Sequence, residues 1–222
     1  MGEAELNRSS QQLTIHSIFY FYGEAATASL AIKIADDISQ CWNEPEATIT
    51  IHHHPYNVRF QIEGIYAPDL QPDKVWYNDQ PRLNFFRIEE FVGGNVSFVD
   101  EIGSNTGYFK LENLLQTATT AAHEYGHTLG LKHPKNLDLR GGGMPCIMHP
   151  RGTLVDPPLQ YYPTAKPGEN GGTLNPIYRK VLPVDIEALR LHKLDFNQQG
   201  LATVGEYSSL YHEKHRPEDF QQ

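Results

Sequence analysis

The sequence lacks several features that would assign it to a class at once. It has no apolar run near the ~20 residues that a membrane-spanning helix needs, and residues 1–12 are polar, without the apolar core of a signal peptide. Basic residues are scarce: 18 lysines and arginines stand against 27 aspartates and glutamates, a formal net charge of −9. We therefore expect no membrane span and no nucleic-acid partner.

Cysteine is also scarce, because Cys41 and Cys146 are the only two. They allow at most one disulfide, and the sequence alone does not decide whether they pair. A latency thiol at Cys146 and a small buried thiol are both left open. With 222 residues, of which 39% are hydrophobic, the chain is long enough for one domain with a substantial core.

One short stretch carries recognisable chemistry. His123 and His127 are four residues apart, and the preceding residues 114–122 contain no proline or glycine. In a helix, positions i and i+4 share one face, so both imidazoles can reach the same metal ion. Glu124 would then lie roughly 100° further round the helix, beside the metal but poorly placed to bind it. The spacing predicts a metal site with a neighbouring carboxylate.

The residues that follow complete this site. Gly130 can end the helix in a left-handed conformation and turn the chain sharply, so that His133 returns as a third ligand. Three imidazoles leave the fourth position of a zinc ion open to water, as catalysis requires. We predict one catalytic Zn²⁺ on His123, His127 and His133. Its bound water would be activated by Glu124, a general base that passes the proton to the departing amine.

The extended histidine motif, followed by Met148, resembles the signature of the metzincin metallopeptidases. It is similar to matrixins more than to astacins, serralysins or reprolysins. Pro150 stands where astacins and serralysins have a tyrosine, and Pro134 stands where reprolysins have an aspartate. Strong motif identity covers residues 123–150, and the order of elements extends the resemblance over about 13–195.

The resemblance implies a fold and an activity. The fold would be α+β (α/β/α), a twisted, mostly parallel sheet with a backing helix, an active-site helix and a C-terminal helix. The activity would be zinc-dependent hydrolysis of internal peptide bonds in a peptide or protein substrate, with Met148 as an apolar floor beneath the imidazoles. We also expect a monomer that is secreted or periplasmic. Calcium is left open, but no motif indicates it.

The pattern of apolar residues predicts the elements. Strands are expected at 13–22, 48–51, 58–65, 74–77, 82–88, 95–100 and 105–111, and helices at 24–42 and 184–194. We divide the chain into a polar N-terminal segment (1–12), a catalytic domain (13–195) and a polar C-terminal extension (196–222).

Two regions are candidates for substrate binding. Metzincins bind the substrate backbone as an added strand at a sheet edge, and we favour Asn95, Val96, Ser97 and Phe98 for that edge, against a strand with no binding role. Residues 149–183 form a long stretch rich in proline, glycine and tyrosine, which in metzincins walls the pocket for the residue after the cleaved bond. The sequence leaves two alternatives open for Tyr161 and Tyr162: one of them reaches the site, or both pack on the domain surface.

Other histidines allow further interpretations. In a strand, His52 and His54 would share one face, so the run 52–54 is either a second metal site or a solvated polar run. His212 and His215 are three apart, and we interpret them as part of a solvated tail.

The motif also leaves alternatives at the level of function. One is a zinc-stabilised, non-catalytic peptide-binding module, which would have no reason to retain Glu124. Another is a hydrolase that acts on something other than peptides. Glu124 favours an enzyme over the binding module.

Overall fold

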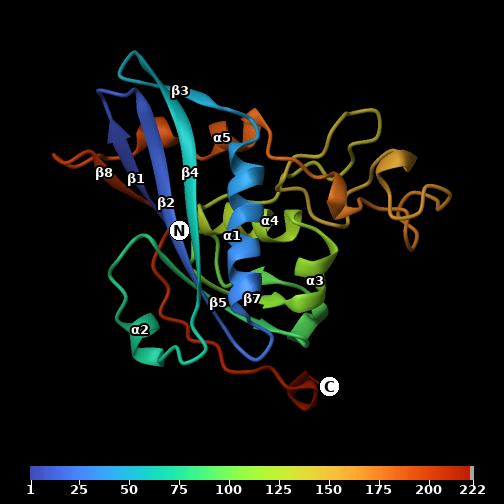
Figure 1. Cartoon of the computed structure of the whole chain (residues 1–222). Helices are drawn as coiled ribbons and strands as arrows, with labels where there is room; N and C mark the ends of the chain where they lie inside the picture. The colour runs from blue at the N-terminus through green and yellow to red at the C-terminus, as the bar shows by residue number, and fades with distance from the viewer. Residues whose placement is uncertain (221–222) are drawn as a thin grey trace.

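A mixed sheet forms the frame of the protein (Figure 1). The computed structural model describes residues 1–220. The strands of this sheet are β1 (Gly2–Asn7), β2 (Gln12–Tyr22), β3 (Thr48–Ile51), β4 (His54–Tyr66), β5 (Leu83–Glu89), β6 (Phe98–Val99), β7 (Thr106–Lys110) and β8 (Leu201–Val204). The expected α+β class is confirmed.

The sheet is parallel at its centre and antiparallel at its edges. Its order is β3-β4-β2-β5-β7-β6, and β4, β2, β5 and β7 run parallel. The first half of the long strand β2 also pairs with β1, which in turn pairs with β8. Strands β3 and β6 are antiparallel to their neighbours. The expectation of a mostly parallel sheet therefore holds for the centre only.

Two helices pack on the same face of this sheet. Helix α1 (Ala28–Asn43) starts where the Thr27 hydroxyl accepts a hydrogen bond from the Leu30 N–H, and its apolar face is buried. Helix α4 (Thr119–Thr128) lies against it. The indole N–H of Trp42 donates to the Ala122 carbonyl at 3.0 Å, and Tyr125 packs edge-on against the Trp42 ring. The backing helix thus holds α4 in place from behind.

The other face of the sheet is covered by less regular structure. Helix α2 (Pro72–Trp76) and the C-terminal residues 205–220 cross this face. Tyr211 stacks on Tyr22 of β2 with 5.2 Å between ring centroids, and the Tyr22 hydroxyl accepts a hydrogen bond from the His212 N–H. A 3₁₀ turn, Pro217–Phe220, ends the described chain.

Three sequence predictions fail locally. Residues 74–77 were expected as a strand but lie mostly in α2, because Pro72 in its first turn favours a helix start. The helix before the histidines is interrupted, since α3 (Leu111–Gln116) ends at the extended residue Thr117. The C-terminal helix is reduced to α5 (Pro183–Ala188) and a 3₁₀ turn (Leu191–Lys193), which are separated by the left-handed residue Arg190.

The polar terminal segments contribute to the sheet. Ala4 and Leu6 of β1 and Ala202 and Val204 of β8 are buried, so part of each polar segment packs into the sheet. The polar composition of these segments did not indicate strands β1 and β8, because the two strands form by pairing with each other and with the sheet. The boundaries at 12 and 195 stay a prediction. Among the described residues, no helix is both long and apolar enough to cross a membrane.

Candidate metal centre and its cavity

Helix α4 and the turn after it bring three histidines together. His123 and His127 lie one turn apart on α4, which is buried along its length. At its end, Gly130 takes the left-handed conformation (φ 95°), and the Leu131 N–H donates to the Gly126 carbonyl at 3.0 Å. Only glycine adopts this backbone without strain. The predicted sharp turn is present, and it returns His133 to the other two imidazoles.

The three Nε2 atoms converge on one point. The Nε2 of His133 lies 3.1 Å from the Nε2 of His123 and 3.1 Å from that of His127. The Nδ1 atoms of His123 and His127 lie 2.7 Å and 2.8 Å from the carbonyl oxygens of Ile147 and Leu131. A carbonyl only accepts, so each Nδ1 carries the proton and each Nε2 carries a lone pair. These lone pairs cannot satisfy one another, and three neutral imidazoles with an open fourth position fit zinc.

The surroundings keep these imidazoles neutral. Burial lowers the pKa of His123 well below its ordinary value, and burial lowers the pKa of His127 to about 4. The pKa of the more exposed His133 is lowered as well, again mainly by burial. Because metal ions bind the unprotonated ring, the group is ready to hold a metal ion at neutral pH.

Glu124 lies in the same cavity but outside the group of ligands. Its side chain is buried and has no hydrogen-bond partner in residues 1–220. Burial raises the pKa of Glu124 to about 8, while the nearby charges of Arg179 and Arg151 lower it. A carboxyl group that titrates near neutral pH can both accept and release a proton.

Met148 lies against the helix that carries the histidines. A side chain at position 126 would collide with the sulfur of Met148, so Gly126 permits this close approach. Met148 is buried, and its neighbour Ile147 provides the carbonyl that orients His123. The turn at 146–149 therefore supports the site, while the role of Met148 as a floor stays a prediction.

The histidines open into a cavity of about 500 Å³. Val96, Ser97 and Phe98 line it, as expected for the substrate edge, whereas Asn95, Tyr161 and Tyr162 do not. The strand expected at 95–100 is shortened to β6, because a 3₁₀ turn occupies Gly93–Asn95. Ser97 is held by hydrogen bonds from the Lys110 N–H and the Asn113 amide.

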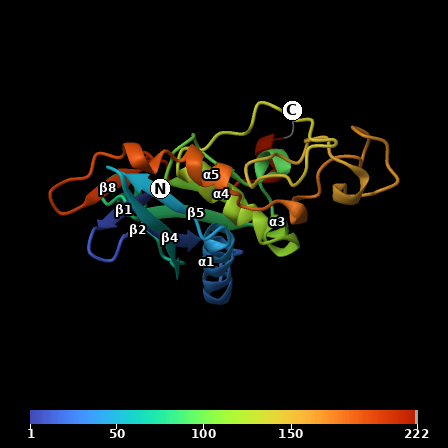
Figure 2. The same cartoon turned by 90° about the horizontal axis from the view of Figure 1, so that it is seen from above.

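The sequence reasoning missed four polar residues of this cavity. They are Asn113, Thr120, Arg151 and Arg179. Thr120 lies one turn before Glu124 on α4, so the helical spacing could have indicated it. Asn113 lies on the separate helix α3, whose orientation relative to α4 the sequence does not give. Arg151 and Arg179 belong to the irregular stretch that extends from the molecule on the side away from β1 and β8 (Figures 1 and 2). Such a stretch has no helical or strand periodicity from which the positions of its side chains could be predicted.

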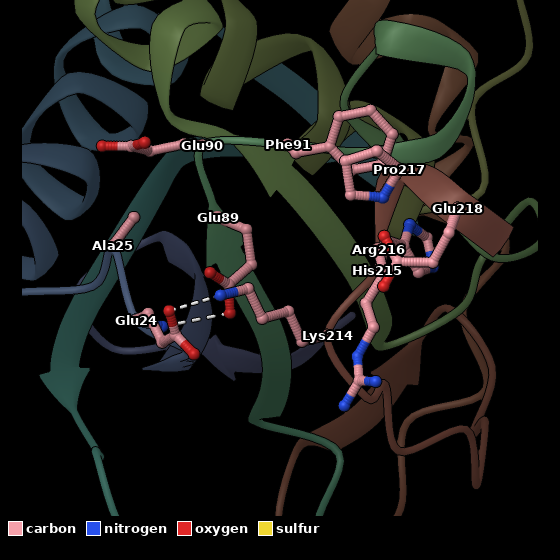
Figure 3. Close-up of a pocket in the computed structure, with 10 residues that line it drawn as sticks. All are labelled: Glu24, Ala25, Glu89, Glu90, Phe91, Lys214, His215, Arg216, Pro217 and Glu218. Atoms are coloured by element: carbon pink, nitrogen blue, oxygen red, sulfur yellow. Dashed lines mark hydrogen bonds and ion pairs between the residues drawn. The ribbon is translucent and has the colours of Figure 1, made fainter. Parts of the chain in front are cut away.

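A second, larger cavity of about 660 Å³ lies between the end of β5 and the C-terminal segment (Figure 3). Two of its charged pairs are formed within the chain: Lys214 points at Glu24 and forms an ion pair with it, and Glu89 pairs with Arg87. The other charged residues of the lining, Glu90, Arg216 and Glu218, are exposed to water. The charges of this cavity are therefore either paired within the chain or solvated, so none of them indicates a ligand.

The remaining histidines do not gather into a group of three ligand side chains within residues 1–220. His52 and His53 have positive φ angles and lie exposed in the β3–β4 turn, so the strand alternation that would align His52 with His54 is absent. In the described part of the chain, only His123, His127 and His133 form a group of three ligand side chains. The second-zinc interpretation therefore has no support.

The C-terminal histidines are half-buried against the sheet, whereas a solvated tail was expected. The Nε2 of His212 lies 2.8 Å from the carboxylate of Asp100. The Gly93 N–H donates to the Nδ1 of His215, whose ring stacks on Tyr108 with 4.3 Å between centroids. Both histidines fasten the tail to the sheet.

Both cysteines are free thiols. Burial raises the pKa of Cys41 to about 11 and that of Cys146 to about 12. Cys146 contacts the Nδ1 of His149 at 3.1 Å and is not among the grouped metal-ligand side chains. A thiol with a raised pKa is unreactive, which favours the interpretation of Cys146 as a buried structural residue.

Comparisons with known proteins do not place the chain in a family. No family model matches it, and no curated protein matches it. A solved structure described as "Structure of myroilysin" is similar over 84% of this chain and 98% of that chain, with 12% sequence identity and a TM-score of 0.35. So distant a likeness carries no functional argument, and no comparison supports the matrixins in particular. The function has to be argued from the site itself.

Proposed function

We propose that this protein is a zinc-dependent endopeptidase. The observation that carries the proposal is the convergence of three Nε2 atoms beside a buried carboxyl group in an open cavity. His123, His127 and His133 would hold the metal ion, and Glu124 would carry the proton. Bound zinc supplies Lewis-acid chemistry, because it polarises a carbonyl oxygen and acidifies a water molecule.

The carboxyl group of Glu124 would move one proton twice. It first accepts the proton of the attacking water and then delivers it to the nitrogen of the departing amine. Its buried position keeps bulk water from competing for that proton. The carbonyls of Ile147 and Leu131 hold the imidazoles of His123 and His127 in the tautomer that leaves Nε2 free.

The sheet edge beside the cavity favours a peptide as substrate. Within residues 1–220, strand β6 pairs only with β7 and is the last strand in the sheet order. Its outer backbone groups are available to an extended chain, which would add to the sheet as another strand. Val96, Ser97 and Phe98 would then lie along the bound peptide. Tyr161 and Tyr162 have no part in this proposal, because they lie outside the cavity.

The main alternative is a zinc-stabilised, non-catalytic peptide-binding module. Such a module gains nothing from Glu124, since a buried carboxyl group without a hydrogen-bond partner destabilises the fold. A hydrolase for other substrates keeps the same metal chemistry but does not need the open strand edge. Both observations favour a peptidase. A monomeric state and secretion stay predictions.

Replacement of Glu124 by glutamine tests the proposal. Glu124→Gln preserves size and removes the proton carrier, so peptide hydrolysis should fall about 10²–10⁴-fold while zinc content stays at the parent level. Glu187→Gln makes the same chemical change at an exposed position of α5 and should keep full activity. Parent-like cleavage by Glu124→Gln would rule out this mechanism. A zinc-loaded parent that cleaves nothing in a diverse peptide library would favour the binding module.

A further inference from the structure

Two arginines line the cavity that contains the histidines. Arg179 is buried, with 5% of its surface exposed, and Arg151 is half-buried. One nitrogen of Arg179 donates to the His149 carbonyl at 3.2 Å, and one nitrogen of Arg151 donates to the Asn113 side chain at 3.0 Å. These contacts use few of the ten N–H donors that two guanidinium groups offer.

Neither guanidinium has a carboxylate partner within the described residues. Three other arginines of the protein, Arg82, Arg87 and Arg140, each form an ion pair with a glutamate or aspartate. The arginines without such a pair elsewhere, at positions 8, 59, 190 and 216, are exposed to water. Arg179 alone among the arginines is buried without an ion pair, which is a costly arrangement for a charge. Glu124 is its nearest acidic neighbour in the cavity lining, but no hydrogen bond or ion pair joins the two side chains in residues 1–220.

Unsatisfied donors lie in the same wall. The Nε of Arg179 and the hydroxyl of Thr120 are buried and have no hydrogen-bond partner in residues 1–220. Thr120 lies one helical turn before Glu124 on α4 and lines the cavity. Buried polar groups are nearly always satisfied in native proteins, so these orphans point to a group that the free protein does not contain.

The charges that line the cavity indicate that the missing group is negatively charged. Glu124 is the only acidic side chain in the lining of the cavity. Burial lowers the pKa of Arg179 to about 10; the charge of Glu124 opposes this shift and that of Arg151 reinforces it. Arg179 therefore stays protonated at neutral pH. Two cations with free donors thus surround the approach to the histidines.

We propose that Arg151 and Arg179 form a subsite for an acidic side chain, aspartate or glutamate, directly next to the bond that is cleaved. The proposal rests on the proposed function and specifies the substrate class. A carboxylate fits the planar fork of a guanidinium, and Thr120 would donate a further hydrogen bond. A peptide extended along β6 turns alternate side chains to opposite sides, so one of them can face this wall.

The test uses peptides that differ in one position. The zinc-loaded protein is incubated with a library of C-terminally amidated peptides, and the products are sequenced. Aspartate or glutamate should be enriched next to the cleaved bond. In a matched pair of substrates, replacing that glutamate by glutamine should lower kcat/KM roughly 10–100-fold, as expected for the loss of a charge-assisted hydrogen bond.

Arginine variants assign the preference. Arg179→Gln and Arg151→Gln should each reduce the ratio between the acidic and the neutral substrate, mainly by slowing hydrolysis of the acidic one. Arg151→Glu should shift the preference toward lysine or arginine. Arg140→Gln removes the same charge from an exposed residue outside the cavity and should leave the ratio unchanged. If the thermal melt shows that Arg179→Gln fails to fold, the ratio is compared between the parent and Arg151→Gln, which changes a half-buried residue.

Binding provides a readout that does not require catalysis. Glu124→Gln, loaded with zinc, should bind the acidic peptide more tightly than its glutamine counterpart in calorimetry, and a second change, Arg179→Gln, should abolish the difference. Cleavage without any acidic preference would overturn the subsite and leave the peptidase proposal standing. The same library with free C-termini is tested in parallel. Cleavage confined to those peptides would also overturn the subsite, because the arginines would then bind a terminal carboxylate. No cleavage with a retained binding preference would reject the peptidase and support the subsite.

Discussion

This protein has two groups of histidines in which the rings lie close together, yet only one of the groups resembles a metal site. In the first group, His123 and His127 give their Nδ1 protons to backbone carbonyls, and their free Nε2 atoms meet that of His133. In the second, the Nε2 of His212 faces the carboxylate of Asp100, and the Nδ1 of His215 accepts a backbone N–H. Proximity alone does not make a metal site; an unclaimed lone pair on each ring does.

The second group supports the first at a distance. His212 and His215 both pack against the ring of Phe98 in β6, and Phe98 lines the cavity of the metal centre. The C-terminal segment therefore holds one wall of the candidate active site from the opposite face of the sheet. The following predictions separate the ligand role of the first group from the anchoring role of the second.

The largest expected difference concerns metal content. His133→Ala removes one of three ligands from an exposed position, so dialysed protein should lose most of its zinc together with its peptidase activity. His212→Ala should retain the parent level of zinc, because that ring lies in another cluster. Elemental analysis of both variants beside the parent measures this. Equal zinc in all three proteins would show that the convergent Nε2 atoms do not bind the metal.

The stability of the zinc-free protein should depend on pH through His127. Burial lowers the pKa of His127 to about 4 in the folded state, below the value of ~6.5 in the unfolded chain. The folded state therefore resists protonation, and the stability that neutral His127 provides is lost as pH falls from ~6.5 toward ~4.

His127→Gln removes the titrating imidazole and should make the stability of the zinc-free protein depend less on pH. Between about pH 7.5 and pH 5, the parent should lose about 2 kcal/mol more than the variant. Urea unfolding of both zinc-free proteins at several pH values measures the difference, in which the titration of Glu124 cancels to first order. Parallel curves for the two proteins would contradict the lowered pKa.

A smaller effect is expected from the anchoring histidine. His212→Ala removes the contact with Asp100 and part of the packing against Phe98. The unfolding free energy should fall by about 1.5 kcal/mol, and limited proteolysis should cut sooner within residues 205–220. His192→Ala, at a histidine that is exposed in the turn after α5, serves as the matched control. Unchanged proteolysis of the tail would argue against its role as an anchor.

The sequence predicted the elements that are determined by interactions between residues close together in the chain. Helix α1 and strand β2 follow from the spacing of apolar residues, and the three histidines follow from a motif of eleven residues. The left-handed turn at Gly130 could be foreseen because only glycine adopts that backbone freely. In each of these cases, the relevant interactions join residues close together in the chain.

The elements that escaped prediction depend on distant partners. Strand β8 exists through its pairing with β1, nearly the whole chain away, and the tail is fixed by Tyr22, Asp100 and Tyr108. Arg179 enters the cavity from a stretch without periodic structure. Such contacts leave no pattern in a single sequence, because tertiary packing rather than local propensity decides them.

The smallest effect is expected at the exposed histidines of the β3–β4 turn. His53 has a φ of 68° and makes no side-chain hydrogen bond within the described residues. His53→Asn keeps a residue that tolerates this left-handed backbone, so the unfolding free energy should change by less than about 0.5 kcal/mol. Zinc content should stay the same, since His52, His53 and His54 do not converge on one point as the three histidines near α4 do. A fall in the zinc bound per chain would revive the second metal site and show that an irregular turn can gather ligands that the free protein holds apart.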